Sequence, residues 1–302
     1  MSTTLTGWCD HPVTVTAPAT SANLGPGFDS FGLALDLANE VTAEVCERGL
    51  HVDVDGEGAS ELALDESHLV VRAARAAFAA LGVQPPGLWL RCRDRVPHGR
   101  GLGSSAAAIT AGIVAARALV PGGEHGLDDA AALRLASRLE GHPDNVAAAL
   151  LGGLTVAWTD DDGARAVRLE PHVGVVALVP RHAVPTSTAR GLLPTEVAHT
   201  DAAHTAGRAG LLVAALTGRP ELLLPATEER LHQQHRGTAM PETLALVTAL
   251  RSAGHAAVVS GAGPTVLVLH AEDATPDLDG LVAAEWRAQP LSVSLTGTQA
   301  RR

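Results

Sequence analysis

Residues 95–107 read Arg-Val-Pro-His-Gly-Arg-Gly-Leu-Gly-Ser-Ser-Ala-Ala and are the most informative stretch of the chain. The apolar pattern of residues 88–96 predicts a strand that leads into this stretch, and residues 104–119 predict a helix that leaves it. Glycines in the connecting loop let backbone N–H groups approach an oxyanion with no Cβ in the way. The first turn of the helix adds unpaired N–H donors and the positive end of its dipole. The stretch therefore predicts a phosphate-binding loop.

The same loop has three other interpretations. It could be only a tight strand-to-helix turn with a serine cap. A dinucleotide-binding fingerprint is opposed by the spacing, because Gly99, Gly101 and Gly103 give GxGxG and the next element is a second helix. A P-loop needs a lysine after its last glycine, and the chain contains no lysine. The remaining interpretation is a phosphate-binding loop that is neither a P-loop nor a dinucleotide-binding loop.

Composition narrows the class of protein. The 302 residues are 46% hydrophobic and carry a formal net charge of −11. An acidic chain is a poor partner for nucleic acid or an anionic membrane, so neither partner is expected. The absence of lysine excludes Schiff-base chemistry. Cys9, Cys46 and Cys92 are too dispersed for a metal site, and residues 106–120 are too short to span a membrane. We expect a soluble, cytoplasmic protein with reduced thiols.

The order of expected elements indicates an α+β fold. Strand and helix patterns alternate, but without the strict rhythm of a doubly wound sheet. Residues 18–27 are expected to form a polar loop, residues 68–81 a helix, and residues 221–231 another helix. An acidic turn at residues 160–163 suggests a division into two domains, residues 1–165 and residues 166–302.

Three further segments combine with the loop into one pattern. Residues 17–29 read APATSANLGPGFD, residues 140–146 read EGHPDNV, and residues 260–265 read SGAGPT. Together with residues 97–106, these segments resemble the motifs of the GHMP kinases in the same order along the chain. The first and central segments resemble the forms found in members that phosphorylate homoserine. The resemblance covers nearly the whole chain.

The resemblance implies a fold and an activity. The fold is a two-domain GHMP kinase fold, with an N-terminal ATP-binding domain that contains a left-handed βαβ unit and a C-terminal ferredoxin-like domain. The activity is ATP- and Mg²⁺-dependent phosphorylation of the side-chain hydroxyl of L-homoserine, a step of threonine biosynthesis. Family members are commonly homodimers, so a homodimer is one expected assembly.

The resemblance also implies substrate contacts. The carboxylate of an amino acid needs a cationic fork, for which arginine is suited, and its ammonium needs a carboxylate. Arg190 and Arg236 match the first requirement, and Asp29 beside Asn23 matches the second. Arg236 follows Gln-His where many members have Pro-Tyr. The full set of implied substrate residues is Asn23, Asp29, His142, Arg190, Arg236 and Gly263.

The remaining implied residues belong to ATP, the metal and the reaction centre. Ser105 and Glu140 are the implied Mg²⁺ ligands. The other position considered for the second ligand lies eight residues before His142, but it is Arg134, which cannot bind a cation. No proton acceptor is assigned, because some members use an Asp–Lys pair and this chain has no lysine. Asp144, Asn145 and Thr186 are the implied catalytic residues. The implied ATP-binding residues are Pro97, His98, Gly99, Arg100, Gly101, Leu102, Gly103, Ser104, Ser105, Ala106 and Ala107.

Other functions stay open on the sequence alone. Another GHMP kinase acting on an alcohol or a sugar would not need the arginine and aspartate pairing. A catalytically inactive GHMP-fold protein that only binds a partner would be expected to lose the loop serines or residues 142–145, and both are intact. A dinucleotide oxidoreductase is opposed by the glycine spacing.

Overall fold

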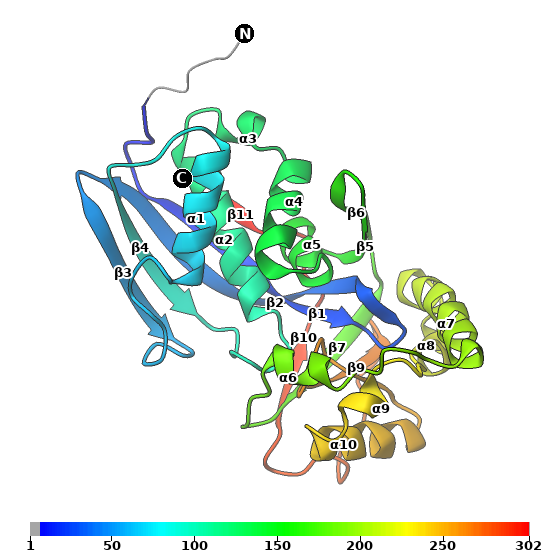
Figure 1. Ribbon diagram of the computed structural model, residues 1–302. Coiled ribbons are helices and arrows are strands. Elements are labelled where there is room, and N and C mark those ends of the chain that lie inside the picture. Colours follow the sequence, from blue (N-terminus) through cyan, green and yellow to red (C-terminus); the bar gives the residue numbers. More distant parts are fainter. Residues whose placement is uncertain (1–6, 302) are drawn as a thin grey trace.

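The computed structural model describes residues 7–301, which form two β-sheets with helices packed on them (Figure 1). The first sheet has seven strands in the order β11-β1-β2-β4-β3, with β5 paired to β2 and β6 paired to β5. Its strands are β1 (Val13–Asn23), β2 (Gly27–Cys46), β3 (Gly49–Gly56), β4 (Gly87–Asp94), β5 (Leu154–Asp160), β6 (Gly163–Leu169) and β11 (Gln299–Arg301).

One pair in this sheet is parallel. β3 and β4 run in the same direction, and helix α1 (Leu69–Ala80) connects them. This is the βαβ unit that the family resemblance implied. The predicted helix at residues 68–81 is confirmed as α1.

The long hairpin of β1 and β2 corrects the predicted loop at residues 18–27. β1 continues to Asn23 and stays paired with β2 as far as Gly27, so most of the expected loop is strand. The second half of β1 is buried on both faces, which removes the alternation by which a strand is recognised. Only residues 24–26 remain as a turn, and positive φ occurs where the turn begins, at Asn23, the last residue of β1, and at Leu24.

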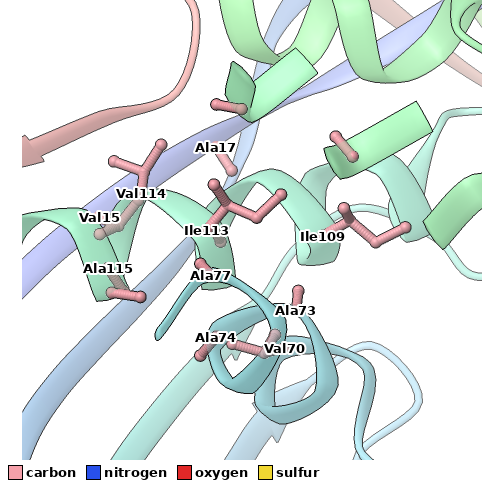
Figure 2. Close-up of a cluster of buried hydrophobic side chains, with 14 of the residues drawn as sticks. Val15, Ala17, Val70, Ala73, Ala74, Ala77, Ile109, Ile113, Val114 and Ala115 are labelled. Carbon is pink, nitrogen blue, oxygen red and sulfur yellow. The ribbon is translucent and has the colours of Figure 1, made fainter. Parts of the chain in front are cut away.

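Helices cover one face of the first sheet. They are α1, α2 (Ser104–Leu119), α3 (Gly123–Gly126), α4 (Asp129–Glu140) and α5 (Asp144–Leu151). α2 lies between α1 and β1, and its apolar side chains meet both (Figure 2). Gly112 allows this close approach, because a Cβ there would overlap the Val70 carbonyl of α1. α2 is therefore fixed on nearly all sides, and so is the loop at its start.

The second sheet has the order β10-β7-β9-β8, with every neighbouring pair antiparallel. Its strands are β7 (Val173–Val179), β8 (Ala256–Val259), β9 (Val266–Ala271) and β10 (Arg287–Leu291). Counted along the chain this is the 4-1-3-2 order of a ferredoxin-like sheet. The connection between β9 and β10, residues 272–286, contains no helix.

The connection between β7 and β8 carries the remaining helices. They are α6 (Thr186–Gly191), α7 (His199–Thr217), η1 (Pro220–Leu222), α8 (Leu223–Ala226), α9 (Gln233–Arg236) and α10 (Pro241–Ser252). The single helix predicted for residues 221–231 is wrong, because only η1 and α8 form there. Pro225 would lie inside such a helix, where it has no N–H to donate to the Glu221 carbonyl.

A shared core joins the two sheets. Leu33 of β2 and Leu267 of β9 belong to one buried cluster, together with Leu212 of α7. The chain also returns to the first sheet at its end, where β11 pairs with β1. The predicted boundary at residue 165 lies within β6, and residues 1–6 of the first predicted domain lie outside the described residues. That division stays a prediction. Among residues 7–301, no helix has the length and apolar character needed to cross a membrane.

Candidate active site

A cavity of about 270 Å³ collects most of the predicted site residues. It lies where the loop before α2 meets α6, α9 and the turn after β8. Its lining includes Asn23, Pro97, His98, Gly99, Arg100, Gly101, Leu102, Gly103, Ser104, Ser105, Glu140, His142, Asp144, Asn145, Thr186, Arg190 and Arg236. Segments up to about two hundred positions apart therefore meet in one place.

The loop before α2 is held in a glycine-only conformation. Gly103 is the N-cap residue with φ +66°, and a Cβ there would overlap the Thr20 hydroxyl. Gly101 has φ +75°, and its Cβ would overlap the Ser260 carbonyl. No side chain caps α2, so the N–H groups of its first turn stay available to a ligand.

Two residues of the predicted ATP set point elsewhere. The methyl groups of Ala106 and Ala107 are buried in the core of the first sheet. The Ala107 N–H donates to the Gly103 carbonyl, which leaves the Ala106 N–H as the free backbone donor of the two.

Ser105 and Glu140 meet at the rim of the phosphate loop. The Ser105 hydroxyl donates to Glu140 Oε1 at 2.5 Å. Burial raises the pKa of Glu140 above its ordinary value, against the effect of the serine. Two oxygen ligands, one of them a carboxylate that burial leaves poorly solvated, fit a Mg²⁺ ion that takes its other ligands from phosphates and water. The arrangement therefore fits the implied metal pair.

A second cluster surrounds the start of α5. Asp144 is buried, and its Oδ1 accepts from His142 Nδ1 at 2.8 Å and from the Asn145 N–H at 2.7 Å. The hydrogen bond to Asp144 raises the pKa of His142. The Thr20 hydroxyl donates to Asn145 Oδ1 at 2.8 Å. Asp144 thus holds both neighbours in position.

Asp29 and Arg190 form a two-pronged ion pair. The two Arg190 Nη atoms donate to the two Asp29 oxygens at 2.7 and 3.0 Å. Asp29 has φ +54°, a conformation disfavoured for a non-glycine residue, and Asn23 Oδ1 accepts from its N–H. The amide of Asn23 is also occupied, because its Nδ2 donates to the Gly261 carbonyl. Asn23 therefore acts within the protein by fixing Asp29.

Arg236 is a buried cation without an acidic partner. Only 1% of it is exposed, and among residues 7–301 no carboxylate lies within 4.0 Å of its guanidinium. Its Nη1 donates to the Gly261 carbonyl at 3.0 Å and to His232 Nδ1 at 3.3 Å, while its Nε has no partner. Burial lowers the pKa of Arg236. A desolvated guanidinium with an unused N–H is suited to an anionic ligand.

Family models match both halves of the chain. The model described as the GHMP kinases N terminal domain matches residues 68–153, and the model described as GHMP kinases C terminal matches residues 211–288. The chain belongs to the GHMP kinase family.

Named relatives of this GHMP kinase cover nearly its full length. A homoserine kinase of Streptomyces coelicolor is 58% identical over 287 residues, 94% of this chain and 93% of that protein. A homoserine kinase of Clavibacter michiganensis is 51% identical over 95% of this chain and 93% of that protein. The crystal structure of homoserine kinase from Cytophaga hutchinsonii superposes with a TM-score of 0.81 at 25% identity, covering 96% of this chain and 97% of that one.

Three residues that line the cavity of this GHMP kinase were not predicted from the sequence. They are Asn39, His68 and Asp94. His68 Nδ1 is buried without a hydrogen-bond partner, and Asn39 Oδ1 accepts from the N–H groups of Arg95 and Val96. No local pattern marks these residues, since their neighbours come from other parts of the chain.

Gly263 and His232 also differ from what the sequence indicated. Gly263 does not line the cavity, and its N–H donates to the Ser260 carbonyl, although Gly261 and Ala262 before it do line the cavity. His232 was not singled out, yet it is completely buried, donates through Nε2 to the Gly25 carbonyl and orients Arg236.

Proposed function

We propose that this GHMP kinase is a homoserine kinase, which transfers the terminal phosphoryl group of ATP to the side-chain hydroxyl of L-homoserine. The observation that carries the proposal is the buried Arg236 without a carboxylate partner, in the same cavity as the phosphate loop and Arg190, the ion-pair partner of Asp29. The full-length relatives named homoserine kinase support it. The product, O-phospho-L-homoserine, would serve threonine biosynthesis.

The charged residues suit an amino acid that also carries an alcohol. Arg236 and Arg190 would bind the carboxylate, and Asp29 would bind the ammonium. A zwitterion can take up both halves of the Asp29–Arg190 pair, because it offers each of them an opposite charge. His142 lies in the same cavity and would contact the substrate. A sugar or an uncharged alcohol would leave Arg236 buried and unpaired.

ATP would bind along the loop of residues 97–105, with its phosphates at the start of α2. The N–H groups of the first turn and the dipole of this 16-residue helix favour the phosphate charge there. Ser105 and Glu140 would hold Mg²⁺, which neutralises charge on the phosphates when it is bound.

Catalysis would rest on positioning and charge stabilisation. Phosphoryl transfer asks little covalent chemistry of the protein, so no strong base is required. Asn145, fixed by Thr20 and Asp144, and Thr186 at the start of α6 would position the hydroxyl. Asp144 would act by orienting His142 and Asn145.

A coupled ADP-release assay tests the proposal. L-homoserine should be phosphorylated in preference to L-serine, L-threonine, mevalonate and galactose. Turnover of mevalonate or galactose without turnover of homoserine would indicate another GHMP kinase. No turnover of any alcohol, with ATP still bound, would favour an inactive binding protein.

A further inference from the structure

The side chain of Arg100 binds backbone carbonyls of its own phosphate loop and of the segment that follows β7. Its Nε donates to the Pro180 carbonyl at 3.2 Å, Nη1 to the His98 carbonyl at 2.8 Å and Nη2 to the Arg181 carbonyl at 2.7 Å. All three acceptors are backbone carbonyls, and no carboxylate lies within 4.0 Å of this guanidinium in the described part of the chain. Three of its N–H groups are thus committed to backbone rather than to a ligand.

Two of these carbonyls belong to the segment that carries α6. Residues 180–185 connect β7 to α6, and the Val184 N–H donates to the Gly99 carbonyl at 3.0 Å. The loop therefore binds this connection through three hydrogen bonds. The Arg100 side chain donates two of them, and the Gly99 carbonyl accepts the third. α6 begins immediately afterwards and presents Thr186 and Arg190 to the cavity.

The other side of the loop is also fixed. The Arg100 carbonyl accepts from the Thr265 N–H at 3.3 Å, and the Ser260 hydroxyl lies 2.7 Å from the Gly101 carbonyl. These contacts hold the loop against residues 260 and 265. A shift of the loop on ligand binding would therefore be passed to the connection to α6. α6 is short, six residues, and much of it is exposed, so its position depends on these contacts.

We propose that Arg100 is a positioning residue that couples the phosphate loop to α6, so that nucleotide and amino-acid substrate favour each other's binding. The inference rests on the proposed function, because it takes ATP at the loop and homoserine at Arg190. The planar guanidinium spans three carbonyls at once, which a lysine ammonium on a flexible stem does not do in the same geometry. Coupling between two binding sites is reciprocal, so either ligand reports it.

Calorimetry on the full chain measures this coupling. The Kd of L-homoserine is determined with and without a non-hydrolysable ATP analogue and Mg²⁺, in the wild-type protein and in Arg100→Ala. In the wild type the analogue should tighten homoserine binding by about 5-fold or more. In Arg100→Ala this ratio should fall to about 1, while homoserine alone binds within a few-fold of the wild-type Kd. Arg100→Lys should give a ratio in between.

Arg181→Ala is the matched control. It removes an exposed arginine from the same segment but keeps the carbonyl that Arg100 binds, so its coupling ratio should equal that of the wild type. A ratio unchanged in Arg100→Ala, or absent in the wild type, overturns the proposal. If Arg100→Ala fails to fold by circular dichroism, Arg100→Lys decides, and a wild-type ratio there overturns it.

The assay with L-homoserine separates the two levels of inference. Wild-type turnover of homoserine without coupling contradicts the role of Arg100 alone. Failure of the wild type to bind or phosphorylate homoserine contradicts the proposed function itself.

Discussion

At the scale of single residues, Arg190 and Arg236 differ in the groups of the protein that bind their guanidinium groups. Arg190 has a carboxylate partner and is about one-third exposed (34%), whereas Arg236 is buried without one. Asn23 and His232 set the surroundings of this pair through the Gly261 carbonyl and the Gly25 carbonyl. At the substrate end of the cavity, a carboxylate thus holds Arg190, whereas a backbone carbonyl and a histidine hold Arg236.

Replacing Arg190 should raise the KM for homoserine and leave the KM for ATP nearly unchanged. Arg190→Ala removes a hydrogen-bonded charge worth about 1.5–3 kcal/mol, so the KM for homoserine should rise about 10- to 150-fold. The KM for ATP should change by less than about 3-fold in steady-state assays, and the exposed Arg219→Ala should change neither value. Equal rises for both substrates would contradict the carboxylate role.

Glu140 should make stability depend on pH when no divalent cation is present. Burial raises its pKa in the folded state, so its contribution to stability is complete at low pH and is lost as pH rises from about 4.5 through the folded-state pKa. Glutamine cannot ionise. The free energy of unfolding of Glu140→Gln, relative to the wild type, should therefore increase with pH over this window and then level off, as measured by urea titration.

The opposite trend serves as the control for Glu140. The hydrogen bond from Arg219 lowers the pKa of the exposed Glu221, so Glu221→Gln should become relatively less stable as pH rises through the acidic range. A Glu140→Gln difference that does not vary with pH would show that the folded protein leaves this carboxyl well solvated.

At the scale of elements, the junction between the loop and α2 should be the most sensitive point to an added methyl group. Gly103→Ala combines a left-handed φ with overlap on Thr20, whose hydroxyl holds Asn145. Gly82→Ala is the matched variant, since Gly82 has φ +74° with no atom within 4 Å of the added carbon. Gly82→Ala should cost about 1–2 kcal/mol of stability and keep kcat/KM.

Gly103→Ala should cost more stability than Gly82→Ala and lower kcat/KM at least about 10-fold, because Asn145 loses its support. Thermal unfolding and the ADP-release assay measure both effects. Equal losses in the two variants would mean that the Thr20 contact has no part in holding the site.

Elements with local signals could be predicted from the sequence, and those fixed by distant partners could not. α1 follows from its apolar periodicity, and α2 follows from the glycines and the proline that bound it. Residues 18–23 of β1 were predicted as part of a loop, because the elements that bury both faces of this stretch, α2 and the cluster that joins the two sheets, come from distant parts of the chain. β11 has three residues, and only pairing with β1 makes it a strand.

The candidate site divides in the same way. Arg190, Arg236 and Glu140 were predicted because they lie in or near recognisable motifs, and the structure brings them into one cavity. His232 and His68 were not, because what makes them special is complete burial and the groups around them. The Gly25 carbonyl that binds His232 is 207 positions away.

At the scale of the whole molecule, the two sheets should unfold as one cooperative unit. Leu33 of β2 and Leu267 of β9 are both fully buried in the cluster that joins the sheets, and β11 ties the end of the chain to β1. Shortening either leucine therefore leaves a void in the shared cluster, and both sheets lose packing contacts. Leu33→Ala and Leu267→Ala should each lower the free energy of unfolding by about 2–5 kcal/mol.

Native-state hydrogen exchange distinguishes joint from separate unfolding. The most protected amides of β1 and of β9 should lose protection by the same free energy in either variant, because both exchange through global unfolding. The exposed Leu64→Ala should leave both unchanged. If Leu267→Ala lowered protection in β9 while β1 kept its wild-type value, the sheets would be independent units. The site between them would then form only when two folded parts dock, and its affinity for substrate would fall with the docking equilibrium.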